Sequence, residues 1–307
     1  MKNCYQSIQV LIVALIGVLP LSLNAQSLTG PAGVLEETVQ PELLGFTFKS
    51  GYSHTFGSGL SAGAGRLAVD RATTGLSYFQ RYDTGFLSIS ADYQYDWNQF
   101  SGPALFGNTQ ETGFNIYYTH RIVDNWGVFV LAAGGFAAET AADLSRGGQF
   151  SIALGPTYRF SESLSLYAGP LYRTRLENSG QLIGVLGVDW KINPHWALRT
   201  FNGGVITYDV FADRATVIDA SVEYQTSQLR LRTNPLEGGI GSDNALAVRQ
   251  LTFGLGVTQT LGERFYVRVH CDVSTLRRYQ FRSNGNSSSQ FDASTGVTVG
   301  IQGGVNF

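Results

Sequence analysis

The sequence predicts an all-β fold, a transmembrane antiparallel up-and-down β-barrel of fourteen strands. Three observations support this prediction. Long segments alternate apolar with small or polar residues, tight turns alternate with longer polar connections, and no apolar run after residue 25 is as long as a transmembrane helix. Only helices and closed barrels satisfy every backbone polar group in lipid, so a membrane protein with this sequence has to be built from strands.

The first 25 residues have the layout of a secretory signal peptide. Lys2 precedes an apolar run over residues 10–19, and we expect cleavage after Ala25. A membrane-anchor helix is the alternative, but the run is well short of the roughly 20 residues that a span requires. We expect residues 26–44, which do not alternate, to form a periplasmic or lumenal segment, and residues 45–307 to form the barrel.

Alternation is clearest at the C-terminus, where Phe291, Val299 and Phe307 are expected to share an apolar face opposite small and polar residues. These runs reach the roughly 9 to 11 residues that a tilted membrane strand needs. Twelve strands remain an alternative, because the second and eleventh segments alternate weakly. The fourteen expected strands are 45–56, 64–81, 85–97, 110–122, 126–138, 148–160, 164–176, 181–192, 196–209, 216–225, 228–234, 246–261, 265–282 and 291–307.

The turns repeat one design, in which three residues lie between bulky apolar side chains. Residues 123–125, 161–163, 193–195 and 262–264 fit it, and shorter or longer variants occur at Thr226-Ser227 and near 83–85. Longer polar connections lie between them, as in barrels with short periplasmic turns and long outer loops. The Thr226-Ser227 link predicts a register in which Glu223 opposes Arg230 on the lumenal face.

A soluble sandwich or lipocalin-like barrel has the same period and is the alternative fold. Charges of both signs and many glycines on the polar face favour a lumen over a solvated exterior. Large aromatic residues also gather at the short-turn ends of the strands, where they are expected to form an interfacial girdle: Trp126, Trp190, Trp196, Phe160 and Phe265.

The last strand, Ser294 to Phe307, resembles the terminal strand of Gram-negative outer-membrane barrel proteins. Phe307, Val305 and Ile301 match its lipid-facing positions and its C-terminal aromatic residue. The resemblance implies an outer-membrane location and recognition of these residues by the barrel-insertion machinery. As a whole, the chain is more similar to the uncharacterised outer-membrane barrel families than to the general trimeric porins, because no single long loop could fold inward as a constriction.

Little in the sequence indicates catalysis. The formal net charge of −2 gives no attraction for nucleic acid, and we expect neither a metal nor a cofactor. His270, Asp272 and Ser274 share the lumenal face with Arg268, and Gly256 and Gly254 are expected to oppose His270 and Asp272. We interpret this group as a structural hydrogen-bonded network, with a membrane-embedded hydrolase as a distant alternative.

A channel or transporter for small solutes is the favoured function, because twelve to fourteen strands enclose more than a filled eight-stranded interior. A structural or surface-interaction barrel with a plugged lumen is the alternative. Alternation assigns twelve basic and seven acidic residues to the lumen, which predicts a mildly basic interior and a weak preference for small anionic solutes. The expected lumenal network comprises Arg159, Arg173, Arg175, Asp219, Glu223, Arg230, Arg232, Arg268, His270, Asp272 and Arg278.

Overall fold

A computed structural model describes residues 44–307 apart from 62–64, 177–179, 202, 235–238, 241–243 and 284–285. The predicted signal peptide lies outside the described residues. So does the predicted N-terminal segment, except for Leu44.

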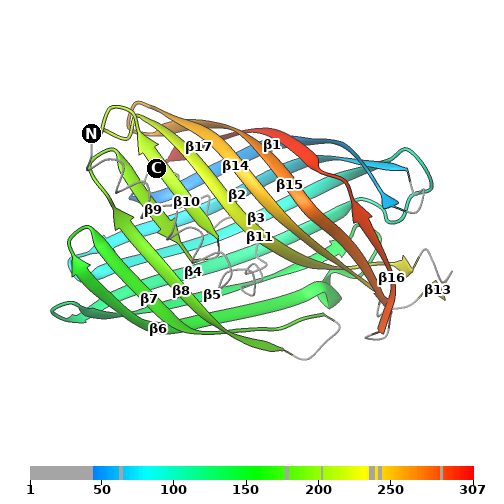
Figure 1. The fold of residues 1–307 in the computed structure, drawn as a ribbon, viewed down its shortest axis with the longest axis horizontal. Helices are drawn as coiled ribbons and strands as arrows, with labels where there is room; N and C mark the ends of the chain where they lie inside the picture. The colour runs from blue at the N-terminus through cyan, green and yellow to red at the C-terminus, as the bar shows by residue number, and fades with distance from the viewer. Residues whose placement is uncertain are drawn as a thin grey trace, which may run out of the picture.

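The described chain forms a closed fourteen-stranded antiparallel barrel, which confirms the predicted fold (Figure 1). Each strand pairs with the next around the wall, and β1 closes the barrel on β17. The wall strands are β1 (Gly45–Gly59), β2 (Arg66–Tyr82), β3 (Gly85–Phe100), β4 (Thr109–Val123), β5 (Trp126–Glu139), β6 (Gly148–Ser161), β7 (Leu164–Arg173), β8 (Gln181–Lys191), β9 (Trp196–Thr200), β10 (Gly204–Asp209), β11 (Thr216–Arg230), β14 (Ala245–Leu261), β15 (Phe265–Ser283) and a last strand in two halves, β16 (Asn286–Ala293) and β17 (Gly296–Asn306).

The two ends of the barrel differ. Short links such as 83–84, 124–125 and 262–264 gather at one end, called here the turn end. The opposite end, called the loop end, carries the longer connections, the short 3₁₀ helix η2 (Leu144–Gly147) and the two-residue strands β12 (Thr233–Asn234) and β13 (Gly239–Ile240). In Figure 1 the C-terminus lies at the turn end, away from β13 and β16.

The predicted strand count is right, but three of the predicted strands, 196–209, 216–225 and 228–234, are wrong. In place of the predicted strand 196–209, the chain forms two short strands, β9 and β10, which pair with each other as a hairpin. Residues 210–215 therefore return to the turn end, where Ala215 accepts a hydrogen bond from the Thr260 N–H. No turn forms at Thr226-Ser227, because both residues lie inside β11, paired with Val248 and Arg249 of β14.

The half of β11 nearer the loop end turns inward across the barrel. Its last residue, Arg230, pairs with Ala138 of β5 in a parallel bridge, although five strands, β6–β10, lie between β5 and β11 in the wall. Gln228 lies two residues earlier on the same strand. Its backbone carbonyl accepts a hydrogen bond from the Gln149 side-chain amide, and its Oε1 accepts one from the Leu176 N–H. β11 therefore divides the loop half of the barrel, with β5, β6 and the segment after β7 on one side of it and β14 paired along its edge.

The side of the sheet that faces inward changes within β15. Leu276 has a φ of 50°, and the register with β14 shifts at this point. One extra residue reverses the facing of everything after it. Arg277 is buried inside, whereas Arg278 is exposed and pairs with Asp292 at 3.1 Å.

The outer surface of the wall is apolar. Phe48, Ile89, Phe114, Leu186 and Val269 all point outward and are exposed. A belt of this kind is what a transmembrane barrel presents to lipid. Among the residues that the structure describes, no helix is long and apolar enough to cross a membrane.

Candidate functional site

The lumen contains a wide cavity at the turn end, called here the vestibule, with a volume of about 960 Å³. Strands β1–β11 and the turns between them contribute to its lining. Six basic and five acidic side chains lie along it, so the charge is nearly balanced. Two of these side chains form an ion pair, with Arg199 Nε 3.3 Å from Asp189 Oδ1.

A second cavity of about 300 Å³, called here the chamber, lies nearer the loop end. It is enclosed by β1–β5 on one side and by β11, β14, β15 and β17 on the other. Three basic side chains line it, Lys49, Arg71 and Arg277, against five acidic ones, Asp92, Asp96, Glu111, Glu223 and Asp272. The chamber is therefore more acidic than the vestibule.

A layer of buried inward-facing side chains, called here the septum, separates the two cavities. On β3, for example, Ser90 falls between Ser88 of the vestibule and Asp92 of the chamber. Asn115 of β4 and Asp219 of β11 follow the same order along their strands, and none of the septum residues lines either cavity. The septum consists of Ser90, Asn115, Asp219, Thr258, Tyr266 and Arg268, which are all buried.

The septum contains an ion pair. Arg268 of β15 and Asp219 of β11 are joined at 3.0 Å, with side chains only 8% and 0% exposed. β14 lies between these two strands, and Gly256 on it makes room for the pair. A Cβ atom at Gly256 would lie 2.5 Å from Asp219 Oδ2 and 2.8 Å from Arg268 Nη2.

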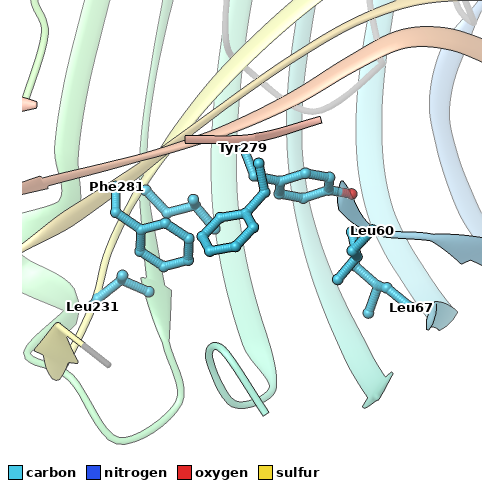
Figure 2. Close-up of a cluster of buried hydrophobic side chains, with 7 residues drawn as sticks. Leu60, Leu67, Leu231, Tyr279 and Phe281 are labelled. Carbon is cyan, nitrogen blue, oxygen red and sulfur yellow. The ribbon is translucent and has the colours of Figure 1, made fainter. Parts of the chain in front are cut away.

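The loop end of the lumen is filled by an apolar cluster, called here the cap. Figure 2 shows its side chains pointing toward one another from β2, β15 and the segment after β11. Phe281 meets Phe291 with the ring centroids 5.9 Å apart, and Phe106 stacks on Tyr279. The buried members are Leu60, Leu67, Leu231, Leu246, Tyr279, Phe281 and Phe291. The cap closes the chamber from the loop end.

Several predicted network residues do line the lumen. Arg159 lines the vestibule, whereas Glu223, His270 and Asp272 line the chamber. The predicted register is confirmed, because Gly256 opposes His270 and Gly254 opposes Asp272. Asp219 and Arg268, described above, complete this part of the network.

Other predicted lumenal residues line neither cavity. Arg230 is buried at the end of β11, where it donates to the Arg146 carbonyl of η2, and Arg232 is exposed beyond the end of that strand. Because β11 is a single strand, Glu223 pairs with Thr252 and not with Arg230. Arg278 lies outside because of the bulge at Leu276.

Arg173 and Arg175 lie in the space between β7 and β11 and line neither cavity. Arg173 donates to Gln181 Oε1 at 2.8 Å and lies near Tyr224 on the outward face of β11. Arg175 follows β7, and its pKa is lowered by burial and by the nearby Arg249 and Arg282. With these arginines outside the cavities, the predicted positive surplus is absent from the described linings.

Several lining residues were not predicted. Arg71 forms a bidentate pair with Asp96, at 2.8 and 2.9 Å, but lies in a segment whose alternation is weak. Arg277 donates to Ser58 and to the Tyr279 hydroxyl, and only the bulge places it inside. Glu111 lies on the inward face of β4. Asn115 is four residues further along the same strand and therefore on the same face, so the alternation of β4 could have predicted that Glu111 faces the lumen.

The terminal and aromatic residues lie as follows. Phe307 is exposed and donates its N–H to the Phe46 carbonyl, while Ile301 and Val305 oppose Val269 and Phe265 on the outer face. The five girdle residues lie near the turn end, where all are exposed except the half-buried Trp190, and the Trp126 ring meets Tyr158 at 4.8 Å between centroids. The girdle residues are Trp126, Trp190, Trp196, Phe160 and Phe265.

The geometry around His270 does not form a catalytic triad. His270 Nε2 lies 3.5 Å from Asp272, but the Ser274 hydroxyl is paired with Thr252 at 3.1 Å. Among the described residues, no group of three or more His, Cys, Asp or Glu side chains could hold a metal ion.

No protein-family model matches the chain, and no curated protein matches it. Solved structures of similar shape include a deltaS2 mutant of the TodX monoaromatic hydrocarbon channel, 9% identical, with a TM-score of 0.42 over 87% of this chain and 91% of that one. The translocator domain of the autotransporter NalP from Neisseria meningitidis is 10% identical, with a TM-score of 0.41 over 89% and 92%. The KdgM porin is 13% identical, with a TM-score of 0.35 over 84% and 99%. Similarity at this level carries no argument about what passes through this barrel.

Proposed function

We propose that the protein is an outer-membrane channel for small solutes, exported with a cleaved signal peptide and closed in the conformation described above. The vestibule is the observation that supports this proposal. A cavity of about 960 Å³ lined by charged and polar side chains lies inside a wall whose outer face is apolar. A barrel that served only as a scaffold would not need so large a polar interior.

The septum and the cap lie in series between the vestibule and the loop end. The protein therefore has to rearrange at both levels before a solute can cross. In planar lipid bilayers we expect the refolded chain to be silent for most of the recording, with rare openings to a small conductance. A large, permanently open conductance would contradict the closed state, and complete silence in variants with both levels opened would reject the channel.

A structural or surface-interaction barrel is the second candidate. The cap and the inward course of β11 favour it, because they fill the loop half of the lumen with side chains and backbone. A membrane-embedded hydrolase is a more distant third, since Ser274 is hydrogen-bonded to Thr252. Labelling by a serine-reactive probe would revive it.

Insertion into a membrane gives the first testable prediction. We expect the unboiled protein to migrate differently from the boiled protein in detergent gels and to give a β-type circular dichroism spectrum, because a closed barrel resists the detergent. Deletion of Phe307 should lower membrane assembly several-fold and leave secretion nearly unchanged, because we expect outer-membrane lipid and the barrel-insertion machinery to be the partners of this end. The matched control is deletion of residues from the predicted segment 26–44, and equal loss of secretion and assembly in the Phe307 variant would contradict the role of Phe307.

A further inference from the structure

One row of inward-facing side chains beside the septum is apolar. Its members pair one with the next across the wall, and those from β2 to β5 line the vestibule. A water-filled barrel interior is polar, and the next row toward the loop end is mostly so, with Ser90, Asn115 and Arg173 among its members. The apolar row consists of Phe79, Tyr117, Leu131, Ala153 and Leu171, with Ser88 of β3 as the exception.

Five aromatic rings gather at this row, and all of them line the vestibule. Phe86 meets Tyr117 edge-on with the ring centroids 5.2 Å apart, and Phe79 lies 5.6 Å from Phe86. Tyr167 of β7 meets Phe201, which follows β9, at 5.9 Å. Aromatic rings prefer offset or edge-on contacts with other rings. The inner end of the vestibule therefore offers surfaces on which a further ring can pack.

The backbone of β8 makes room for one of these rings. Gly187 pairs with Tyr167 across the two strands, and a Cβ atom at Gly187 would lie 2.3 Å from two carbon atoms of the tyrosine ring. A larger residue at position 187 would push the ring away from the wall and into the vestibule. Gly187 thus keeps this space open.

The hydroxyl groups of Tyr117 and Tyr167 are the polar groups of this region. The two tyrosines lie within electrostatic range of each other and of the Asp189–Arg199 ion pair. Both are half-buried, and within the described part of the chain neither hydroxyl makes a hydrogen bond. Partly buried polar groups of this kind are completed by water or by a ligand.

We propose that the inner end of the vestibule binds a small monocyclic aromatic solute that carries a hydroxyl group. Its ring packs on Phe86, Tyr117 and Phe201, and its hydroxyl group hydrogen-bonds to the tyrosine hydroxyls. Ligand pockets typically combine an aromatic and apolar lining with a few polar groups that orient the ligand. The nearly balanced charge of the vestibule favours a neutral solute.

The site lies on the turn-end side of the septum and of the cap. Neither obstruction has to open for a solute to bind there. The inference rests on the proposed channel function and deepens it by naming the class of solute, but the binding itself does not require conduction.

Equilibrium dialysis of the full barrel tests the proposal, with equal detergent on both sides so that uptake by micelles cancels. Three probes of similar size are compared: 4-methylphenol, 4-methylcyclohexanol, which has the hydroxyl group without the aromatic ring, and toluene, which has the ring without the hydroxyl group. We expect saturable binding of 4-methylphenol, at least fivefold tighter than that of either other probe. An affinity for another probe that equals or exceeds it, or no saturable binding of 4-methylphenol, overturns the proposal.

Removal of the two hydroxyl groups locates the polar contact. Tyr117→Phe with Tyr167→Phe should weaken 4-methylphenol binding at least fivefold and leave toluene binding within twofold of the parent, because the rings stay in place. The matched control is Tyr158→Phe with Tyr172→Phe, which removes two hydroxyl groups from the outer face of β6 and β7 and should change neither affinity. An unchanged affinity in the first variant, or an equal loss in the control, overturns the assignment to this site.

Removal of two phenyl rings tests the apolar contact. Phe86→Leu with Phe201→Leu should weaken the binding of 4-methylphenol and of toluene at least threefold, whereas Phe114→Leu with Phe160→Leu on the exposed outer face should not. If the first of these variants fails to fold, the conservative tyrosine variant decides alone. Binding of 4-methylphenol to a barrel that never conducts would reject the channel and keep the site, whereas conduction without this binding would do the reverse.

Discussion

A barrel with both the cap and the septum opened is expected to conduct at least tenfold more current than the parent or than a barrel opened at either level alone. The cap variant is Phe281→Ala with Leu231→Ala, which removes two large side chains that are almost fully buried. The septum variant is Asp219→Ser with Arg268→Ser, which removes the ion pair. Since the two obstructions lie in series, the larger resistance limits the current, and opening one level alone leaves the other in control. Apolar constrictions also exclude water, and hence ions, until they are widened or made polar.

Single-channel recording in planar bilayers measures this effect. The matched control for the cap is Phe253→Ala with Leu255→Ala, which removes the same two side-chain types from the exposed outer face of β14. Its conductance should equal that of the parent. A combined variant that folds, as judged by its mobility in detergent gels, yet stays silent would contradict the channel and support the plugged structural barrel.

Alternation predicted the barrel, yet it could not place β9 and β10. The three-residue link at 201–203 preserves parity, so that Trp196, Leu198, Ile206 and Tyr208 keep even numbers on the outer face across the turn. A period-2 pattern therefore runs through the hairpin as though it were one strand. Only the pairing of β9 with β10, a tertiary contact, separates them.

The error at Thr226-Ser227 has a related cause. Thr226, Gln228 and Arg230 occupy the outward face of β11, where lipid-facing apolar residues would be expected. They are polar because this part of the strand packs against protein and not against lipid. In the sequence, polar residues on both faces look like a turn followed by a new strand.

The side chains of the site depended on details that no pattern reveals. Leu276 carries no signal for a bulge, since leucine rarely adopts a positive φ, yet it decides that Arg277 is inside and Arg278 outside. The alternation of their strands correctly predicted that Asp219 and Arg268 face the lumen. Their pairing depends on β11 lying next to β14, and the turn wrongly predicted at Thr226-Ser227 placed another strand between these two.

The septum ion pair gives the last prediction. Asp219→Ala should lower the free energy of unfolding by about 3–5 kcal/mol, because it leaves the Arg268 guanidinium buried without its carboxylate. Replacing both partners, Asp219→Leu with Arg268→Met, should cost much less, since the buried charge is removed together with its partner. Unfolding in guanidinium with the barrel in lipid vesicles measures both.

The exposed pair of Arg278 and Asp292 is the matched control, because its side chains are 50% and 60% exposed. Asp292→Ala should cost less than about 1 kcal/mol, and salt should reduce that effect further. The loss in Asp219→Ala should hardly change with salt, because the pair lies out of reach of solvent ions. If Asp219→Ala proved as mild as Asp292→Ala, or the double replacement as costly as the single one, the septum would be hydrated, and solutes would meet a single barrier at the cap.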